Sequence, residues 1–217
     1  FLQETDETKN SLQGKLIFFF FFCNCLLNQS IAECGATIIG MDFSKSIERA
    51  FVQNDKSNCI FIQGDVQFPP IAFHQFDIVH SSGVLICTNN SELTFSCLEP
   101  CCKLGGKMSV WLYQPRQDRI HNLFNFLREY TSKLPNRIQY SLYSITLLPI
   151  SYVIKRIKGN KQNKREMMID ILDWFSPEFR WEHTHDEASA WFTKRHYKNI
   201  KITTNEVFGF NIIGTKM

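Results

Sequence analysis

The sequence predicts an α/β fold in which a mostly parallel sheet carries helices on both faces. Short runs of β-branched and aromatic residues alternate with segments of helical periodicity up to about residue 115, which is typical of βαβ units. The chain has 217 residues, 44% of them hydrophobic, enough to bury a full core as a single domain over residues 1–217. We expect the parallel strands to end at one edge, where ligands bind.

The expected elements follow one another in the order that this fold requires. The predicted strands cover residues 16–20, 36–41, 59–63, 76–82 and 105–113, with two more near 200–203 and 207–215. The predicted helices cover residues 27–34, 45–54, 95–102 and 186–196. Gly35 is placed to end the first helix, Ser44 to cap the second, and a Gly-Gly turn to precede the fifth strand. Together they predict a seven-stranded sheet.

Residues 119–165 interrupt this pattern as a helical insertion. The segment 119–154 is helical and apolar, with breaks at Leu134-Pro135 and Leu148-Pro149. Lys155 to Arg165 then carries six basic residues around Gly159. A solvated loop and a contact with an acidic partner such as RNA or phosphate both fit this run. The insertion is placed to cap a substrate pocket.

Cysteine usage and hydropathy favour a cytoplasmic protein. Most of the eight cysteines lie inside apolar runs, which indicates reduced core thiols, and none has the spacing of a zinc site, so we expect no metal. The apolar run Leu16 to Leu27 is shorter than the ~20 residues of a membrane-spanning helix. The acidic start of the chain disfavours a signal peptide. The net charge of +3 does not indicate a nucleic-acid partner.

Five segments in one order resemble a known family. They are IIGMDFS, FIQGDVQFPP, FDIVHSSGVL, CCKLGGKMSVWLY and the late DWFSP…EHT…WF. The series resembles class I S-adenosylmethionine-dependent methyltransferases of the methyltransferase type 11 kind, over residues 11–115 and again over 173–216. The resemblance implies a Rossmann-like methyltransferase fold, S-adenosyl-L-methionine as cofactor, and methyl transfer to a small-molecule acceptor. No Asn/Asp-Pro-Pro-Tyr motif follows the fourth strand, which disfavours an RNA methyltransferase.

Two acidic residues follow the second and third predicted strands at the ligand edge. Asp42 ends the second strand, where a carboxylate can accept both ribose hydroxyls of a nucleoside cofactor, although an acid there also suits a helix N-terminus. Phe43 beside it is placed to pack on the adenine. The resemblance implies that Asp65 accepts the adenine amino group and that Val66 offers a backbone amide to the ring.

The fourth and fifth strands supply the remaining candidates. The resemblance implies that Ser81, Ser82 and Gly83 line the methionine part of the cofactor, and Gly83 allows close backbone approach. Asp77 lies at the opposite end of its strand and is interpreted as structural. Tyr113 and His183 are candidates for the substrate side, and the structural interpretation, a core or rim tyrosine and an exposed histidine before a helix, is the favoured one for both. No catalytic residue is assigned, since methyl transfer needs mainly alignment.

The glycine-rich first motif of the family is absent. Aligned without gaps, its Asp-x-Gly-x-Gly-x-Gly falls on Phe19, Phe21, Cys23 and Cys25. Glycines there let the backbone approach the cofactor, and phenylalanines obstruct that approach. One explanation is a catalytically inactive binding or scaffold protein. Another is a mis-spliced gene product, because Phe18 to Gln29 can be encoded by thymine-rich codons ending in CAG, as a translated intron end would be. Sequencing the transcript across Leu16 to Ser30 tests this: a message that encodes the phenylalanines excludes it.

Overall fold

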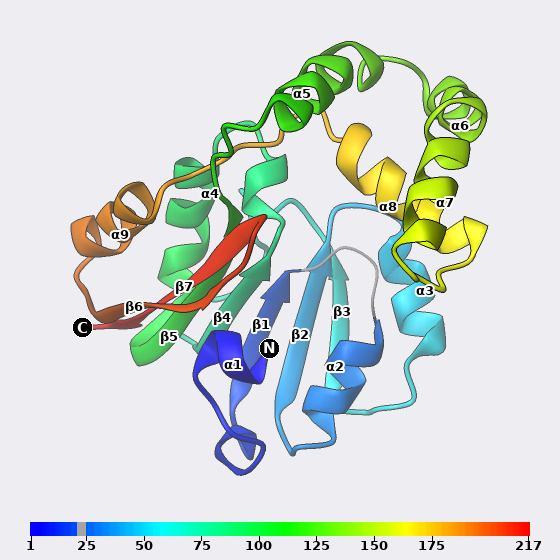
Figure 1. Ribbon diagram of the computed structural model, residues 1–217. Helices are drawn as coiled ribbons and strands as arrows, with labels where there is room; N and C mark the ends of the chain where they lie inside the picture. The colour runs from blue at the N-terminus through cyan, green and yellow to red at the C-terminus, as the bar shows by residue number, and fades with distance from the viewer. Residues whose placement is uncertain (21–24) are drawn as a thin grey trace. The chain divides into compact units, whose positions relative to one another are not determined.

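A computed structural model describes residues 1–20 and 25–217 of the chain. Its strands form one seven-stranded sheet of order β3-β2-β1-β4-β5-β7-β6 (Figure 1). β7 is antiparallel to both of its neighbours, and the other pairs are parallel. The strands are β1 Leu16–Phe20, β2 Thr37–Asp42, β3 Cys59–Gln63, β4 Phe76–Ser82, β5 Cys102–Tyr113, β6 Tyr197–Asn205 and β7 Gly209–Lys216. The predicted mostly parallel sheet is confirmed.

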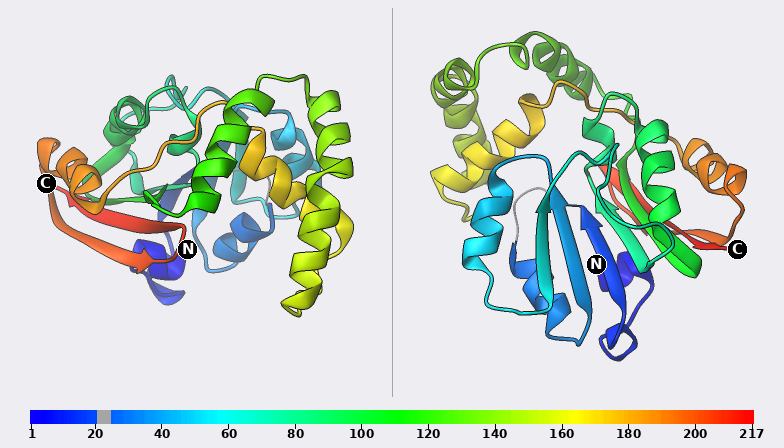
Figure 2. Two further views of the ribbon diagram at one scale, coloured as in Figure 1. Left: turned by 45° about the horizontal axis from the view of Figure 1, so that its top comes forward. Right: turned by 180° about the vertical axis from the view of Figure 1, so that it is seen from behind.

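Helices cover both faces of the sheet, as the alternation of strand side chains requires (Figure 2). In β1, Phe18 and Phe20 point to one face and Ile17 and Phe19 to the other. The first face packs against α4 (Ser91–Leu98) and α9 (His185–Lys194). The second packs against α2 (Cys25–Ala32) and α3 (Ser46–Gln53).

Two of the predicted boundaries are wrong, for identifiable reasons. The helix expected over 95–102 begins at Ser91, because the Asn90 side chain accepts the amide of Leu93 and caps it there. A 3-10 helix, Glu99–Cys101, follows it, and Cys102 already pairs with Phe76 as the first residue of β5. The expected turn at Gly105-Gly106 is instead an irregularity inside β5, where the register against β4 shifts.

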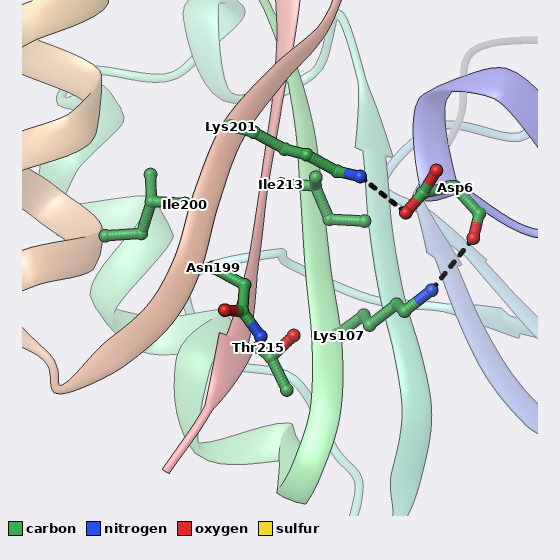
Figure 3. A pocket seen from close by; sticks show the side chains of 7 residues that line it. All are labelled: Asp6, Lys107, Asn199, Ile200, Lys201, Ile213 and Thr215. Carbon is green, nitrogen blue, oxygen red and sulfur yellow. Dashed lines mark hydrogen bonds and ion pairs between the residues drawn. The ribbon is translucent and has the colours of Figure 1, made fainter.

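The N-terminal segment packs against β5, β6 and β7. Its elements are α1 (Leu2–Thr5) and a 3-10 helix, Asn10–Leu12. The backbone oxygen of Glu4 accepts hydrogen bonds from Ser109, Thr203 and Asn211 at 2.8–3.2 Å. A hollow beside it is lined by Asp6, Lys107, Lys201 and their neighbours (Figure 3). Its two lysines are already bound to this segment, so we assign the hollow no ligand.

The chain divides into two compact units. Unit 1 comprises Phe1–Pro115 and Trp181–Met217, and unit 2 comprises Arg116–Arg180. Unit 2 holds α5 (Arg119–Thr131), α6 (Asn136–Ile145), α7 (Leu147–Ile157) and α8 (Lys164–Phe175). Its own core is the cluster of Tyr143, Met168, Ile171 and Phe175. The insertion expected over 119–165 lies within unit 2, which also includes α8.

Several features concern the whole described chain. No helix among residues 1–20 and 25–217 is long and apolar enough to cross a membrane. The same residues contain no group of three or more His, Cys, Asp or Glu that could hold a metal ion. Cys34, Cys97, Cys101 and Cys102 are free thiols. Burial raises the pKa of the Cys102 thiol to about 12, so it stays protonated at neutral pH.

Candidate functional site

Asp42 is a buried carboxylate at the C-terminal end of β2. It is 7% exposed, and its Oδ1 accepts hydrogen bonds from the Ser44 amide and hydroxyl, both at 2.7 Å. Its Oδ2 is buried and has no hydrogen-bond partner within the part of the chain that the structure describes. A buried carboxylate oxygen without a donor is costly. The arrangement therefore holds an acceptor ready for a ligand hydroxyl.

Ser44 orients this carboxylate, a role that the sequence does not reveal. The residue is predicted as the cap of the following helix, but α3 begins at Ser46 with Lys45 as its N-cap. The Ser44 hydroxyl accepts the amide of Ser46 at 3.2 Å and lies 2.7 Å from Asp42 Oδ1. The predicted cap position is therefore wrong by one residue, although the Ser44 hydroxyl still accepts the amide of the first residue of α3.

Asp65 is brought close to Asp42 by strand pairing. Asp42 pairs with Gln63 in β3, and the amide of Gly64 donates to the Asp42 backbone oxygen at 3.1 Å. Asp65 follows at once in a turn, where its Oδ1 accepts the Gln67 amide at 2.9 Å. Val66 is partly buried against the core. The two acids that sequence reasoning selected thus end neighbouring strands at one edge.

Phe43 is the exposed apolar surface of this edge. Its side chain is 75% exposed although it follows a buried strand. The Gln63 side chain donates to its backbone oxygen at 3.1 Å, which fixes the backbone and leaves the ring outside. An exposed aromatic ring beside a buried carboxylate suits a flat heterocycle attached to a sugar.

The end of β4 places a second polar group between apolar strands. Ser81 is fully buried, pairs with Phe20 of β1 and Val110 of β5, and its hydroxyl has no partner among the described residues. Ser82 is exposed. Gly83 adopts φ +72°, and its amide donates to the Trp111 oxygen at 3.3 Å. A side chain at 83 would find room, so the backbone conformation is what requires glycine.

Of the four glycine-loop positions, the structure describes the first fully. Phe19 lies in β1, 2% exposed, with its ring 5.0 Å from that of His80. β1 ends at Phe20, as the sequence predicts. Phe21 and Cys23 lie outside the described residues. Cys25 opens α2, and its side chain also lies outside them.

Tyr113 and His183 are adjacent, although 70 positions in the numbering separate them. Tyr113 is the last residue of β5, and the His183 amide donates to its backbone oxygen at 2.8 Å. His183 is 7% exposed, with Nδ1 3.0 Å from Glu187 Oε1 and Nε2 buried without a partner in the described chain. A carboxylate at Nδ1 favours the tautomer in which Nε2 can accept a proton. Sequence reasoning missed Glu187, for which the i,i+4 spacing to His183 was the available signal.

Asp77 lies at the amino-terminal edge of the sheet and has a structural role, as predicted. Its Oδ2 accepts the Leu16 amide at 2.9 Å, and its Oδ1 lies 2.5 Å from the Lys103 ammonium. Burial would raise the pKa of this carboxyl, but Lys103 and the Leu16 amide outweigh it and hold the pKa below its usual range. The residue therefore joins the starts of β1 and β5.

Comparisons with known proteins agree with this fold. Residues 22–110 match the family described as methyltransferase domain. Among solved structures, magnesium protoporphyrin IX methyltransferase from Synechocystis with bound S-adenosylhomocysteine superposes with a TM-score of 0.54 at 14% identity, over 95% of this chain and 76% of that one. The 1,6-didemethyltoxoflavin-N1-methyltransferase of Burkholderia thailandensis gives 0.57 at 8% identity, over 94% and 72%. No curated protein matches in sequence.

Proposed function

We propose that this chain, which carries a class I, S-adenosylmethionine-dependent methyltransferase domain, binds that cofactor and methylates a small-molecule acceptor. The observation that carries the proposal is Asp42, a buried carboxylate with one unused oxygen at the ligand edge of the methyltransferase sheet. Two neighbours by fold are named for magnesium protoporphyrin IX and 1,6-didemethyltoxoflavin, which supports a small-molecule acceptor.

The residues on the adenosine side fit this cofactor. Asp42 Oδ2 would accept the ribose hydroxyls, with Ser44 holding the other oxygen in place. The exposed ring of Phe43 would cover one face of the adenine. Asp65 would accept the adenine amino group, beside the backbone of Val66. No donor among the described residues would compete with a ribose hydroxyl for Asp42 Oδ2.

The residues on the other side of the edge would handle the methionine part and the acceptor. When bound, S-adenosylmethionine supplies an electrophilic methyl group. Ser81, Ser82 and Gly83 would line its methionine portion, where the buried Ser81 hydroxyl has no protein partner among the described residues. Tyr113 and His183 would border the acceptor, and His183 Nε2 would take the proton of an acidic hydroxyl or amine. Alignment of the acceptor supplies most of the rate.

A second candidate function is a methyltransferase-fold protein that does not bind the cofactor. One observation favours it: phenylalanine and cysteine replace the acid and glycines of the first motif, at Phe19, Phe21, Cys23 and Cys25. Phe19 already fills core space in β1 and offers no polar group there. The two candidate functions differ in whether the residues on the adenosine side suffice to bind S-adenosylmethionine.

Calorimetry with S-adenosylmethionine separates the two candidates. We expect saturable heat for the natural chain, and a loss of about 100-fold in affinity for Asp42→Ala, since a buried charge-assisted pair of hydrogen bonds contributes a few kcal/mol. Ser189→Ala, a substitution of a half-buried residue on α9, is the control. No heat at millimolar cofactor would support the inactive protein. In a methylation assay, His183→Gln should lower kcat while cofactor affinity stays unchanged.

The compartment and partners follow from the same proposal. Free thiols at Cys34, Cys97, Cys101 and Cys102 are typical of a reducing compartment, and we place the protein in the cytoplasm. The partner that the site supports is the small-molecule acceptor, not a nucleic acid. A nucleic-acid acceptor would have to use the basic residues of unit 2, but that unit also exposes many apolar side chains, which do not bind nucleic acid.

A further inference from the structure

α7 in unit 2 exposes an apolar stripe. Ile150, Val153, Ile154 and Ile157 follow at i, i+3, i+4 and i+7, so they share one face of the helix. Their exposed fractions range from 48% to 81%. All of α7 lies in the described part of the chain, and none of its residues is buried. This face is therefore not part of the core of unit 2.

α6, which packs with α7, repeats the feature. Ile138, Leu142 and Ile145 lie at i, i+4 and i+7 and are all exposed, Ile145 to 78%. Tyr143 of α6 and Leu148 of α7 lie off these stripes and meet the unit's own core, which Leu147 at the start of α7 also contacts. A helix at the surface of a globular unit needs only one apolar stripe. The α6–α7 pair has a second one, which we call the outer stripe (138, 142, 145, 150, 153, 154 and 157).

The same part of the chain is uniformly basic. Residues 130–165 contain no Asp or Glu and eight basic residues: Lys133, Arg137, Lys155, Arg156, Lys158, Lys161, Lys164 and Arg165. Lys155 reaches Asp170 of α8 at 2.5 Å. Arg156 lies 5.0 Å from the ring of Tyr152 and donates to the backbone oxygens of Asn160 and Gln162. The cations therefore cluster at the C-terminal end of α7, next to the outer stripe.

We propose that the outer stripe and the basic segment 155–165 bind the surface of an anionic lipid bilayer. An amphipathic helix with isoleucines on one face and Lys/Arg beside it has the composition of an interfacial membrane helix. Anionic headgroups complement the eight like charges, and the boundary between headgroups and acyl chains takes up the apolar side chains. Nucleic acid would satisfy the cations and leave seven apolar side chains in water. A second copy would bring eight like charges together.

Vesicle sedimentation with the full chain tests this surface. The probes are vesicles of phosphatidylcholine alone and of phosphatidylcholine with phosphatidylserine. We expect the chain to pellet only with the second kind and to be released progressively by salt. Ile157→Glu should weaken binding about tenfold, because it removes apolar burial and adds repulsion. The matched control is Val52→Glu on α3 of unit 1, since Val52 and Ile157 are 80% and 81% exposed.

A second experiment tests the contribution of the basic residues separately from that of the apolar side chains. Lys158→Glu with Lys161→Glu should weaken binding by more than about tenfold at low salt. Lys9→Glu with Lys198→Glu makes the same change in net charge on unit 1 and should leave binding intact. Thermal unfolding of each variant checks that the fold is retained.

Three outcomes would overturn the proposal. The first is no sedimentation with either kind of vesicle. The second is equal effects of Ile157→Glu and Val52→Glu. The third is the absence of vesicle binding together with evidence of another occupant. That evidence would be a dimer in light scattering that Ile157→Glu dissociates, or salt-sensitive binding of an RNA duplex.

Discussion

β1 and β2 are neighbouring strands that end at the same edge with opposite chemistry. β2 ends in Asp42, whose carboxylate is buried and half-satisfied, and in the exposed ring of Phe43. β1 ends in Phe20, which is 1% exposed and packs at 4.2 Å ring distance on Phe18. One strand end is organised for a ligand, and the other is organised as core.

Under the proposed function, the difference separates two halves of one cofactor site. The adenosine half would use side chains at and after the ends of β2 and β3, where Asp42 and Asp65 supply carboxylates. The methionine half would use the backbone after β1, where the sequence has no glycine. Affinity and fold therefore respond to different residues, which substitutions can test.

The largest expected effect is on stability. Phe20→Ala should lower the free energy of unfolding by about 3–5 kcal/mol, because it leaves a cavity between β4 and the helices of the first face. Phe43→Ala, at the end of the neighbouring strand, should change it by less than ~0.5 kcal/mol, since that ring is exposed. Chemical denaturation measures both. Equal losses would show that the end of β1 is not core.

The second expected effect is on affinity. Phe21→Gly with Cys23→Gly and Cys25→Gly should strengthen S-adenosylmethionine binding about 100-fold in calorimetry, which is ~2.7 kcal/mol, by giving the cofactor backbone access. Adding Asp42→Ala should remove most of that gain, because both halves act on one ligand. If the glycines change nothing while Asp42→Ala alone matters, the first motif is not a cofactor contact in this chain.

The smallest expected effect concerns the opposite edge and its pH dependence. Asp77→Asn should cost about 1 kcal/mol at pH 7, as the ion pair with Lys103 is lost. The pKa of Asp77 is lowered in the fold, so its contribution is fully present above the unfolded pKa of ~3.9 and disappears as pH falls through the folded value. The natural chain and the variant should converge in acid denaturation. As a control, Asp55→Asn removes an exposed carboxylate and should change the free energy of unfolding at pH 7 by less than ~0.5 kcal/mol.

Much of the fold could be read from local pattern. β1, β3 and β4 have the predicted bounds, because turn residues on either side of each short β-rich run fix where the strand begins and ends. The boundaries of α4 and β5 were wrong, since a side-chain cap at Asn90 and a strand irregularity at Gly106 are set by neighbours. The candidate positions at Asp42 and Asp65 could be found because parallel strands end at one edge.

The sequence by itself determined the order of strands and helices, the acids at the end of β2 and just after β3, and the absence of glycine at positions 19, 21, 23 and 25. Only the tertiary structure decided which polar atoms are satisfied. Ser44 occupies one oxygen of Asp42 and leaves the other unpartnered in the described chain, and Glu187 fixes His183 beside Tyr113. His80, fully buried, lies 3.0 Å from Ser109 and 3.3 Å from Glu4, partners far away in sequence. Local periodicity specifies which face a residue occupies, whereas hydrogen-bond partners depend on distant segments that meet only in the folded chain.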